Sequence, residues 1–457
     1  MSASAVQAKG PKKRNVFDVL ENISRSKKVG AKNILVRVDF NVPMSADAKT
    51  ITDDSRIRGA LPTIQAICKA KCNAILVSHM GRPKLVQKGA DDDATRAEKK
   101  KLSLRPVTDR LSTLLGDDTS VAFAEDCIGA KAEDAVKELS SDGGAVLVLE
   151  NLRFYKEEEK NEVSFARALA SLADAYINDA FGTSHRAHAS VSGVPGIIAP
   201  EMCGIGCLIT SELLYLDFEK TEGSKITALI GGSKVSTKLP VIKGLLKTVD
   251  TLVLGGGLAF TFIKAKNIPV GNSLVEDSMV ETAKELMKEA DALGKNLVLP
   301  VDAVCGESFP SGPGSLDDTM SFDLVEGKGV EDGWSGFDIG PKSVDLFRGE
   351  LKGATKLVFN GPMGVFEYPP YDKGTKGVVD ILETITKEGT ITVVGGGDSV
   401  AALEAFGKTD VVSYISTGGG ATLELLAGEI LPGVAAIAGQ DSMDDFQNGK
   451  VVYCCFK

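Results

Sequence analysis

A long hydrophobic run is absent from this sequence of 457 residues. A membrane-spanning helix needs about 18 consecutive apolar residues, and no stretch reaches that length, so we expect no membrane partner. The first 15 residues, MSASAVQAKGPKKRN, also lack the apolar core of a secretion signal. They are basic and contain no acidic residue, and we expect residues 1–15 to form a flexible tail.

Motifs for structural zinc are absent as well. Eight cysteines are scattered along the chain, no pair has the C-x-x-C spacing, and none of the three histidines stands at a zinc-ligand spacing. Scattered thiols of this kind are typical of a reducing compartment, so we expect a cytoplasmic protein. An organelle is the alternative if the basic N-terminus is the remnant of a transit peptide.

An overall positive charge is also missing, because the formal net charge is −10. Residues 1–205 contain 30 Lys+Arg and 27 Asp+Glu, which gives +3, and residues 206–457 contain the remaining 22 and 35, which gives −13. A chain that is acidic overall is a poor candidate for a nucleic-acid partner. The distribution fits one local anion site in the first half and a metal-dependent site in the second.

Short apolar runs recur along the chain, each followed by a turn signal and then by an amphipathic stretch. Near-continuous apolar strands that alternate with helices indicate parallel sheets covered on both faces. Two such series predict an α/β protein with two doubly wound, Rossmann-like parallel-sheet domains. The expected strands are 33–40, 73–79, 121–126, 145–151 and 175–181 in the first series, and 225–232, 251–257, 296–304, 356–361, 391–397 and 411–420 in the second.

The boundary between the two series falls in a helical stretch. We expect an N-terminal domain at 1–205, an interdomain hinge helix at 206–222 and a C-terminal domain that begins at 223 and ends near 430. The polar, highly charged segment 84–103 interrupts the first series, and we expect it to be a solvent-exposed loop insertion.

Three glycines and an aspartate follow one predicted strand, in ITVVGGGDSVAALEAF, where Asp398 comes directly after Gly395–Gly397. Glycine lets the backbone approach a ligand, and the N-terminus of the following helix favours anions. A carboxylate beside phosphates needs a cation between them, and Mg²⁺ is the usual one. The alternative is that Asp398 caps the helix and binds nothing.

Lysines follow a second glycine pair, in IGGSKVSTK, which contains Lys234 and Lys238. The spacing matches neither the P-loop G-x-x-x-x-G-K-[ST] nor the dinucleotide motif G-x-G-x-x-G. A lysine is a compact charge that can follow a moving phosphoryl group. The alternative is a pair of surface lysines on a first helical turn.

Arginines accompany all three histidines of the chain. Arginine pairs bidentately with phosphate and carboxylate, and several converging arginines would repel one another without a polyanion. An imidazole beside arginines is disfavoured as a cation, so we expect neutral hydrogen-bonding partners or cations induced by a bound anion. The residues that stand at strand ends or helix starts are Arg37, Arg56, Arg82, Arg153 and Arg186, with His79, His185 and His188.

The ordered set of motifs resembles the phosphoglycerate kinase family from about residue 29 to residue 436. The matching blocks are RVDFNVP, DDSRIRGALPT, SHMGRP, LENLRF, DAFGTSHRAHAS, GGSKVSTK, LVLGGGLAFTF, VFNGPMGVFE, GGGDSVAAL and STGGGATLELLAG. The resemblance implies a bilobal monomeric kinase that transfers a phosphoryl group between 1,3-bisphosphoglycerate and ADP to give 3-phosphoglycerate and ATP. It also implies that the segment 431–457 returns toward the N-terminal domain and that hinge bending joins the two substrate sites.

The resemblance implies roles for matching residues. It assigns 3-phosphoglycerate to the N-terminal domain, where the residues expected to bind or brace it are Asp39, Asn41, Arg56, His79, Arg82, Arg153, His185, Arg186 and His188. It assigns the magnesium nucleotide to the C-terminal domain, at Gly232, Lys234, Lys238, Gly256, Gly257, Gly336, Asn360, Pro362, Glu367, Gly396, Gly397, Asp398 and Ser399. Asp398 is the implied Mg²⁺ contact, and Ser399 stands where the family often has threonine.

The implied reaction needs no general base, because the acceptor carboxylate is already ionised at pH 7. Catalysis then depends on positioning and charge neutralisation, and we expect Arg56, Lys234 and the backbone amides at Gly396 and Gly397 to supply them. One rival function is a nicotinamide-dependent dehydrogenase, for which the dinucleotide motif is missing. Another is a non-catalytic relative, which would have lost Arg56, Lys234 or Asp398.

Overall fold

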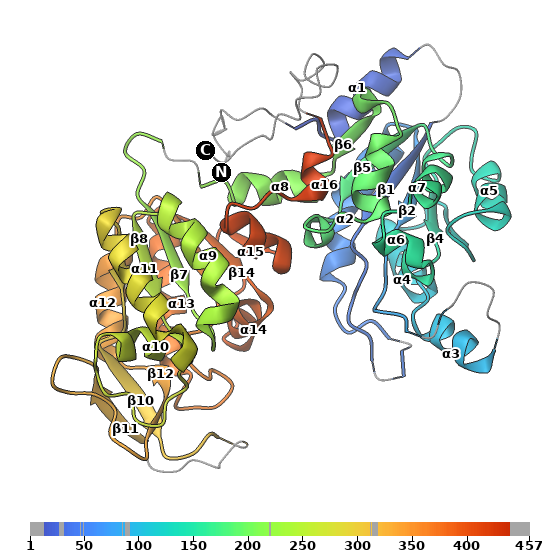
Figure 1. Ribbon diagram of the computed structural model, residues 1–457. Helices are drawn as coiled ribbons and strands as arrows, with labels where there is room; N and C mark the ends of the chain where they lie inside the picture. Colours follow the sequence, from blue (N-terminus) through green and yellow to red (C-terminus); the bar gives the residue numbers. More distant parts are fainter. Residues whose placement is uncertain are drawn as a thin grey trace. The chain divides into compact units, whose positions relative to one another are not determined.

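The structure of the protein is a computed structural model that describes residues 13–26, 32–45, 47–48, 50–84, 86, 92–218, 221–310, 312 and 319–438. The chain divides into two compact units, Met1–Leu214 with Ile430–Lys457 and Tyr215–Glu429 (Figure 1). Most of the predicted N-terminal tail and of the segment 431–457 lies outside the described residues. None of the described helices combines the length and apolar character that a bilayer crossing requires.

The first unit is built on a six-stranded parallel sheet in the order β3-β4-β2-β1-β5-β6. Its central strands are buried along nearly their whole length, as their continuous apolar sequences predict. The strands are β1 Asn33–Val38, β2 Asn73–Val77, β3 Val121–Ala124, β4 Val146–Leu149, β5 Ala175–Asp179 and β6 Cys203–Ile205.

Helices flank this sheet, and the first of them begins with a reciprocal cap. The Asn15 side chain accepts from the amide of Asp18 while the Asp18 carboxylate accepts from the amide of Asn15. Arg14 is also buried, so residues 13–15 of the predicted tail are part of the folded unit. The helices are α1 Val16–Arg25, α2 Ser55–Lys69, α3 Asp93–Lys101, α4 Arg105–Leu115, α5 Ala130–Lys137, α6 Lys156–Glu159, α7 Val163–Ala170, α8 Cys207–Tyr215 and α16 Pro432–Ala435.

Two sequence-based expectations for the first half are corrected. The segment 84–103 contains helix α3, because the Asp92 side chain accepts from the amide of Thr95 at 2.7 Å and lysines occupy the C-terminal turn. The helix expected at 206–222 ends at Tyr215. Beyond it, the side chain of Lys356 donates to the carbonyl of Asp217 and lies 5.2 Å from the centre of the Phe218 ring.

The start of α8 is capped by a buried carboxylate from the sheet. Asp179, the last residue of β5, accepts from the amides of Leu208 at 2.9 Å and Ile209 at 3.2 Å. Asp179 is fully buried, and burial raises the pKa of its carboxyl to about 7, although these hydrogen bonds oppose the shift. The cap therefore carries a group that titrates near neutral pH.

This cap predicts a pH dependence of stability. The pKa of Asp179 is higher in the folded state than its ordinary value of about 3.9. The protonated carboxyl therefore stabilises the folded state fully below about pH 4, and this contribution to the free energy of unfolding is lost as the pH rises to about 7. Asp179→Asn keeps the capping oxygen and removes the titration. The free energy of unfolding of this variant, relative to the wild type, should therefore be higher at pH 7.5 than at pH 5, by on the order of 2 kcal/mol.

Urea unfolding at the two pH values measures this difference. Asp109→Asn, at an exposed position of α4, controls for the loss of one carboxylate. An Asp179→Asn difference that is the same at pH 5 and pH 7.5 contradicts the prediction.

The second unit contains another six-stranded parallel sheet, in the order β15-β14-β13-β7-β8-β9. Helices lie on both of its faces in Figure 1. The strands are β7 Ile226–Ile230, β8 Thr251–Leu254, β9 Asn296–Val298, β13 Lys356–Asn360, β14 Ile391–Gly395 and β15 Tyr414–Ser416. The helices are α9 Val235–Thr248, α10 Gly257–Ala265, α11 Val280–Ala292, α12 Pro341–Leu351, α13 Lys373–Lys387, α14 Gly397–Ala405 and α15 Gly420–Leu426. The two doubly wound α/β units confirm the predicted fold class.

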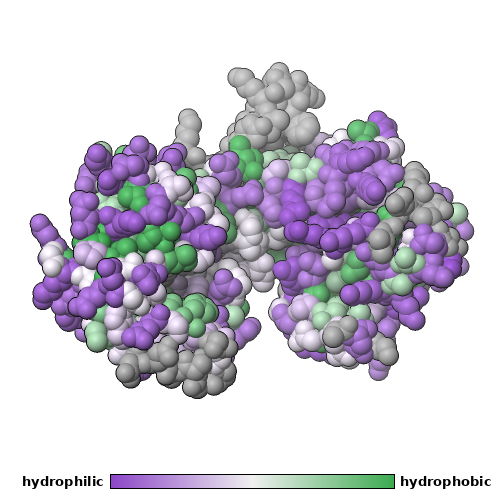
Figure 2. All heavy atoms as spheres, turned by 60° about the horizontal axis from the view of Figure 1, so that its bottom comes forward, coloured by the Kyte–Doolittle hydropathy of each residue, from purple (hydrophilic) through white to green (hydrophobic). Residues whose placement is uncertain are grey.

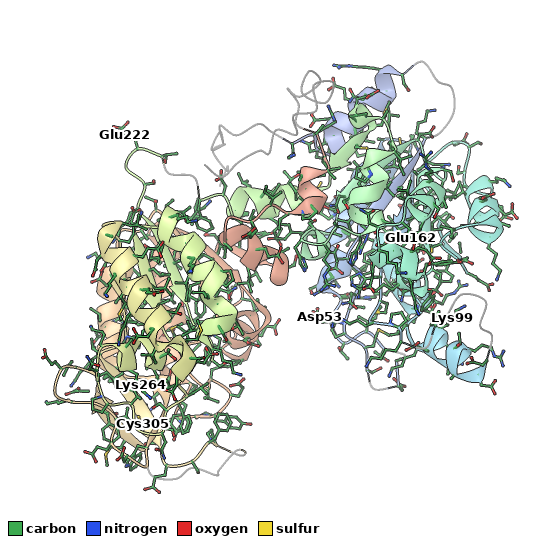
Figure 3. All side chains as sticks on the ribbon, viewed as in Figure 1. Asp53, Lys99, Glu162, Glu222, Lys264 and Cys305 are labelled. Carbon is green, nitrogen blue, oxygen red and sulfur yellow. The ribbon has the colours of Figure 1, made fainter. Side chains whose placement is uncertain are left out.

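A three-stranded antiparallel sheet in this unit was not predicted. It has the order β11-β10-β12, with β10 Asp302–Gly306, β11 Thr319–Asp323 and β12 Ser335–Ile339. The single strand expected at 296–304 is wrong: Pro300, which has no amide hydrogen to donate, lies between β9 and β10. Figure 3 shows Cys305 in this small sheet and Lys264 in the nearby helix α10. Strands β11 and β12 have too few apolar residues to be recognised from sequence.

Polar side chains cover much of the exterior, as the composition of 25% charged residues leads one to expect. Figure 2 shows hydrophilic residues over a large part of the visible face. The cores include buried strand residues, such as Ile34, Leu76 and Ile177 in the first unit and Leu229, Phe359 and Val394 in the second.

Candidate active site

The predicted basic residues of the first unit gather where β1, β2 and β5 end. Because these strands are adjacent and parallel, their carboxyl ends meet at the same edge of the sheet. Arg37 lies within β1, Asp39 follows it, and His79 follows β2. The segment after β5 brings His185, Arg186 and His188 to the same edge, and Arg153 comes from the segment after β4. Figure 3 places Asp53 just before α2, the helix that supplies Arg56.

His79 is held against a buried arginine. A guanidinium nitrogen of Arg37 lies 3.2 Å from Nδ1 of His79, and the two residues are 1% and 4% exposed. Burial lowers the pKa of His79 well below its usual range, and the charges of Arg37, Arg153 and Arg56 lower it further. The imidazole is therefore neutral at physiological pH.

Arg56 is oriented by a carboxylate. It donates to Asp39 at 2.8 Å, and the arginine side chain is 36% exposed whereas that of Asp39 is 9% exposed. Asp39 thus fixes one end of the guanidinium and leaves the other accessible. A guanidinium that is already oriented can bind an anion with a smaller loss of conformational entropy than a freely rotating arginine side chain.

The loop after β2 is fixed by two predicted substrate residues. The amide of Gly81 donates to the Asn41 side chain at 2.8 Å, and Arg153 donates to the carbonyl of Gly81 at 2.7 Å. Gly81 has φ +60°, and a Cβ there would lie 2.7 Å from a methyl group of Leu102, so glycine is favoured at this turn. Arg82, the next residue, is exposed.

The remaining two histidines share this charged environment. Nε of Arg186 lies 3.2 Å from Nε2 of His185. Burial, together with the charges of Arg37, Arg153 and Arg186, lowers the pKa of His188 to about 4. Burial also lowers the pKa of Arg153, with like-charge contributions from Arg37, Arg186 and Arg82. The five arginines therefore interact electrostatically with one another or with the same histidine, as the sequence predicted.

Two residues of this region were not predicted. Ser190 and Glu158 are buried and bonded to each other, with Ser190 Oγ 2.5 Å from one carboxylate oxygen and its amide 2.9 Å from the other. Glu158 is the middle residue of a run of three glutamates, and nothing in that run distinguishes a buried member from its exposed neighbour Glu159.

In the second unit, glycine-rich turns after β7, β8, β13 and β14 form the other predicted site. The amide of Gly232 donates to the carbonyl of Pro362 at 3.2 Å. Gly256 has φ +66°, and a Cβ at this position would lie 2.8 Å from the backbone of Gly232. These close approaches leave room for backbone only, which explains the glycines.

A small pocket lies beside this turn. Gly256, Gly257 and Gly336 line it together with Phe260 and Met363. Any side chain at Gly336 would close it, because a Cβ there would lie 2.0 Å from the Phe260 ring. Glu367 is exposed on the following segment, in which the amide of Val365 donates to the carbonyl of Phe337.

Lys238 and Asn360 meet at the carboxyl end of β13. Nζ of Lys238 donates to the side-chain oxygen of Asn360 at 2.5 Å, and burial lowers the pKa of the lysine while Asp398 opposes the shift. The side-chain nitrogen of Asn360 is buried and has no hydrogen-bond partner within the described part of the chain. Ser399 accepts from the amide of Gly361 at 2.6 Å. An ammonium and an unpaired amide donor thus face a site suited to an anion.

Asp398 is not the N-cap of α14. Gly396, with φ +92°, occupies the cap, whereas Asp398 lies exposed in the first turn. Lys234 is exposed and precedes the first turn of α9. No cluster of three or more potential metal ligands occurs among the described residues. One exposed carboxylate nevertheless fits Mg²⁺, which in nucleotide sites takes most of its ligands from phosphate and water.

Comparison with known proteins gives one consistent result. Residues 24–429 match the family model described as phosphoglycerate kinase. The chain is 48% identical over 410 residues to a phosphoglycerate kinase from Synechococcus sp. (strain JA-2-3B'a(2-13)), covering 90% of this chain and 96% of the relative. It is 47% identical over 407 residues to phosphoglycerate kinase 1, chloroplastic, from Arabidopsis thaliana, covering 89% and 79%. The solved phosphoglycerate kinase from Coxiella burnetii superposes with a TM-score of 0.78 at 33% identity, over 94% of this chain and 99% of that one.

Proposed function

The chain belongs to the phosphoglycerate kinase family, and from this membership we propose which of its residues bind the two substrates and which stabilise the transferred group. The protein is a kinase that catalyses the reversible transfer of a phosphoryl group between 1,3-bisphosphoglycerate and ADP, giving 3-phosphoglycerate and ATP in glycolysis. The acceptor in the reverse direction is a carboxylate, which needs no deprotonation at pH 7. Positioning and charge stabilisation therefore have to supply the rate enhancement.

We assign 3-phosphoglycerate to the basic cluster of the first unit. The observation that carries this assignment is the set of five interacting arginines around neutral histidines, since such a concentration of positive charge is stabilised by a bound polyanion. Asp39 orients Arg56, while Asn41 and Arg153 fix the loop that carries Arg82. The residues assigned to this site are Asp39, Asn41, Arg56, His79, Arg82, Arg153, His185, Arg186 and His188.

We assign the nucleotide to the glycine-rich edge of the second unit. Following the family resemblance, we place the base and ribose at the glycine turns of Gly256, Gly257 and Gly336, with Glu367 on the ribose. Lys238, Asn360 and the amides at the start of α14 suit the phosphates. Lys234 and the amides at Gly396 and Gly397 would stabilise the charge of the transferred group. Asp398 would hold Mg²⁺, which neutralises part of the phosphate charge when it is bound.

The three histidines provide a direct test of the substrate assignment. Proton NMR resolves their ring signals, and 3-phosphoglycerate added without nucleotide should shift those of His79 and His188. Binding of an anion should also raise the pKa of His188 from its low value of about 4. Histidine signals that move with ATP but not with 3-phosphoglycerate would overturn the assignment, while absence of coupled NADH oxidation with ATP and 3-phosphoglycerate would favour the non-catalytic alternative.

The magnesium assignment predicts a specific defect. Asp398→Asn removes the proposed metal contact and leaves the first turn of α14 intact, because Gly396 rather than Asp398 is the cap. The Mg²⁺ concentration for half-maximal activity should rise about tenfold, with a smaller loss at saturating Mg²⁺. A magnesium titration of the coupled assay measures this, with Glu404→Gln on the same helix as the control. An unchanged magnesium requirement would assign the ion to the nucleotide alone.

We propose a monomer and a cytoplasmic location. Both proposals rest on the expectations drawn from the sequence. The alternative location is an organelle, and it is supported by relatives from Arabidopsis thaliana and Volvox carteri whose names place those proteins in the chloroplast. Sedimentation analysis and fractionation of the source cells test the two proposals.

A further inference from the structure

A continuous line of hydrogen bonds leads from a buried glutamate to His79. The Ser190 hydroxyl lies 2.5 Å from Glu158 Oε1, Nε of Arg37 lies 2.9 Å from Ser190 Oγ, and another Arg37 nitrogen lies 3.2 Å from Nδ1 of His79. All four residues are buried, and each of their side chains is at most 4% exposed. We call Glu158, Ser190, Arg37 and His79 the relay.

The chemistry of the relay fixes the direction of each bond. A guanidinium only donates hydrogen bonds, so Ser190 Oγ accepts from Arg37 and must send its own hydrogen to the Glu158 carboxylate. For the same reason Nδ1 of His79 is an acceptor and carries no hydrogen. A neutral His79 therefore has its proton on Nε2.

The relay also accounts for the charge of a buried arginine. Arg37 is 1% exposed, and a charge taken out of water to this extent requires counter-charge and full hydrogen bonding. Val38 supplies a carbonyl acceptor, and Glu158 supplies the negative charge through Ser190. Arg37 is thus enclosed by protein partners, unlike Arg56, which keeps an exposed face.

We propose that Glu158, Ser190 and Arg37 are positioning residues that hold His79 as a neutral Nε2–H donor to an anionic oxygen of phosphoglycerate. This inference deepens the proposed function and rests on it, because His79 is assigned there to the substrate. Arg37 acts through His79 and does not itself touch the substrate. A neutral donor of fixed tautomer binds the anion without any proton uptake from solvent.

The tautomer is directly observable without substrate. Long-range ¹H–¹⁵N NMR separates the two neutral tautomers of histidine, and the chain contains three histidines to assign. The wild type should show His79 as the Nε2–H form across the neutral range. Ser190→Ala breaks the relay and should convert His79 to a mixture of tautomers, whereas Ser190→Thr retains the hydroxyl and should restore the single form.

Kinetics separate positioning from general damage. Ser190→Ala should raise the KM for 3-phosphoglycerate about tenfold, as expected for weakening one hydrogen bond to a charged group, and should leave the KM for ATP unchanged. Ser192→Ala is the matched control, because Ser192 lies two residues away in the same turn, Ala189–Gly193, and bonds to the His188 carbonyl instead. If Ser190→Ala does not fold, Glu158→Gln serves instead, since it keeps the shape and removes the charge.

Each outcome has one interpretation. A wild-type His79 in the Nδ1–H or doubly protonated form overturns the proposal, as does a folded Ser190→Ala variant with unchanged tautomer and unchanged KM. A third outcome is that the tautomer is as expected but 3-phosphoglycerate does not shift the His79 signals. The relay then sets the tautomer of His79, and the proposal that His79 donates to the substrate is overturned.

Discussion

Arg56→Ala should lower kcat for the phosphorylation of 3-phosphoglycerate by about 100-fold or more while the protein stays folded. Arg56 is the arginine whose guanidinium is both oriented by a buried partner, Asp39 at 2.8 Å, and still 36% exposed. Its removal takes away a positive charge prepared for the transition state. It also leaves the Asp39 carboxylate unpaired beside an anionic substrate, which adds repulsion.

The coupled assay with ATP, Mg²⁺ and NADH measures this loss. Arg58→Ala is a close control, because Arg58 lies in the same helix, is 55% exposed and pairs with Asp54. An exposed ion pair of this kind contributes about 0–1 kcal/mol, so Arg58→Ala should remain near wild-type activity. Equal losses in the two variants, or a loss below about threefold in Arg56→Ala, would remove Arg56 from the proposed catalytic group.

Lys234→Ala should also reduce kcat by about 100-fold or more. Lys234 is exposed, stands immediately before α9 and lies after the glycine pair that follows β7. A flexible ammonium there can follow the phosphoryl group as it moves, so its interaction strengthens in the transition state. The dissociation constant for ATP, measured by calorimetry, should therefore change much less than kcat.

Lys243→Ala provides the comparison for this variant. Lys243 is an exposed lysine of the same helix, and its removal should leave kcat close to that of the wild type. A Lys234→Ala variant that binds ATP weakly but turns over at the normal rate would show that the lysine contributes ground-state binding only.

The sequence predicted the fold class because it depends on local patterns. Buried parallel strands such as β1, β2 and β7 appear as continuous apolar runs, and the glycines and charged residues at their ends follow in fixed order. Parallel topology then brings strand ends to one edge, so residues such as Arg37 and His79 could be predicted to converge. The family motifs added the substrate roles, which remain proposals at the level of single residues.

Boundaries and partners were decided by tertiary structure. Pro300 separates two strands that belong to different sheets, and the capping side chain of Asp92 begins a helix inside a segment predicted to be a loop. Gly396 occupies the cap for which Asp398 had been considered. In each case a backbone hydrogen bond or its absence determined where a strand or helix begins or ends. The hydrophobic pattern carries little information about such bonds.

The sequence by itself determined which chemical groups the protein has and near which strand ends they lie. It could not determine which of them pair. Ser190 and Arg37 are 153 residues apart, Glu158 is 32 residues from Ser190, and the exposed Glu159 differs from Glu158 in no local feature. Only packing buries one carboxylate and leaves the next in water, and burial is what makes its pairing with Ser190 necessary. The neutral state of His79 was expected from the neighbouring arginines, but its tautomer follows from the tertiary structure alone.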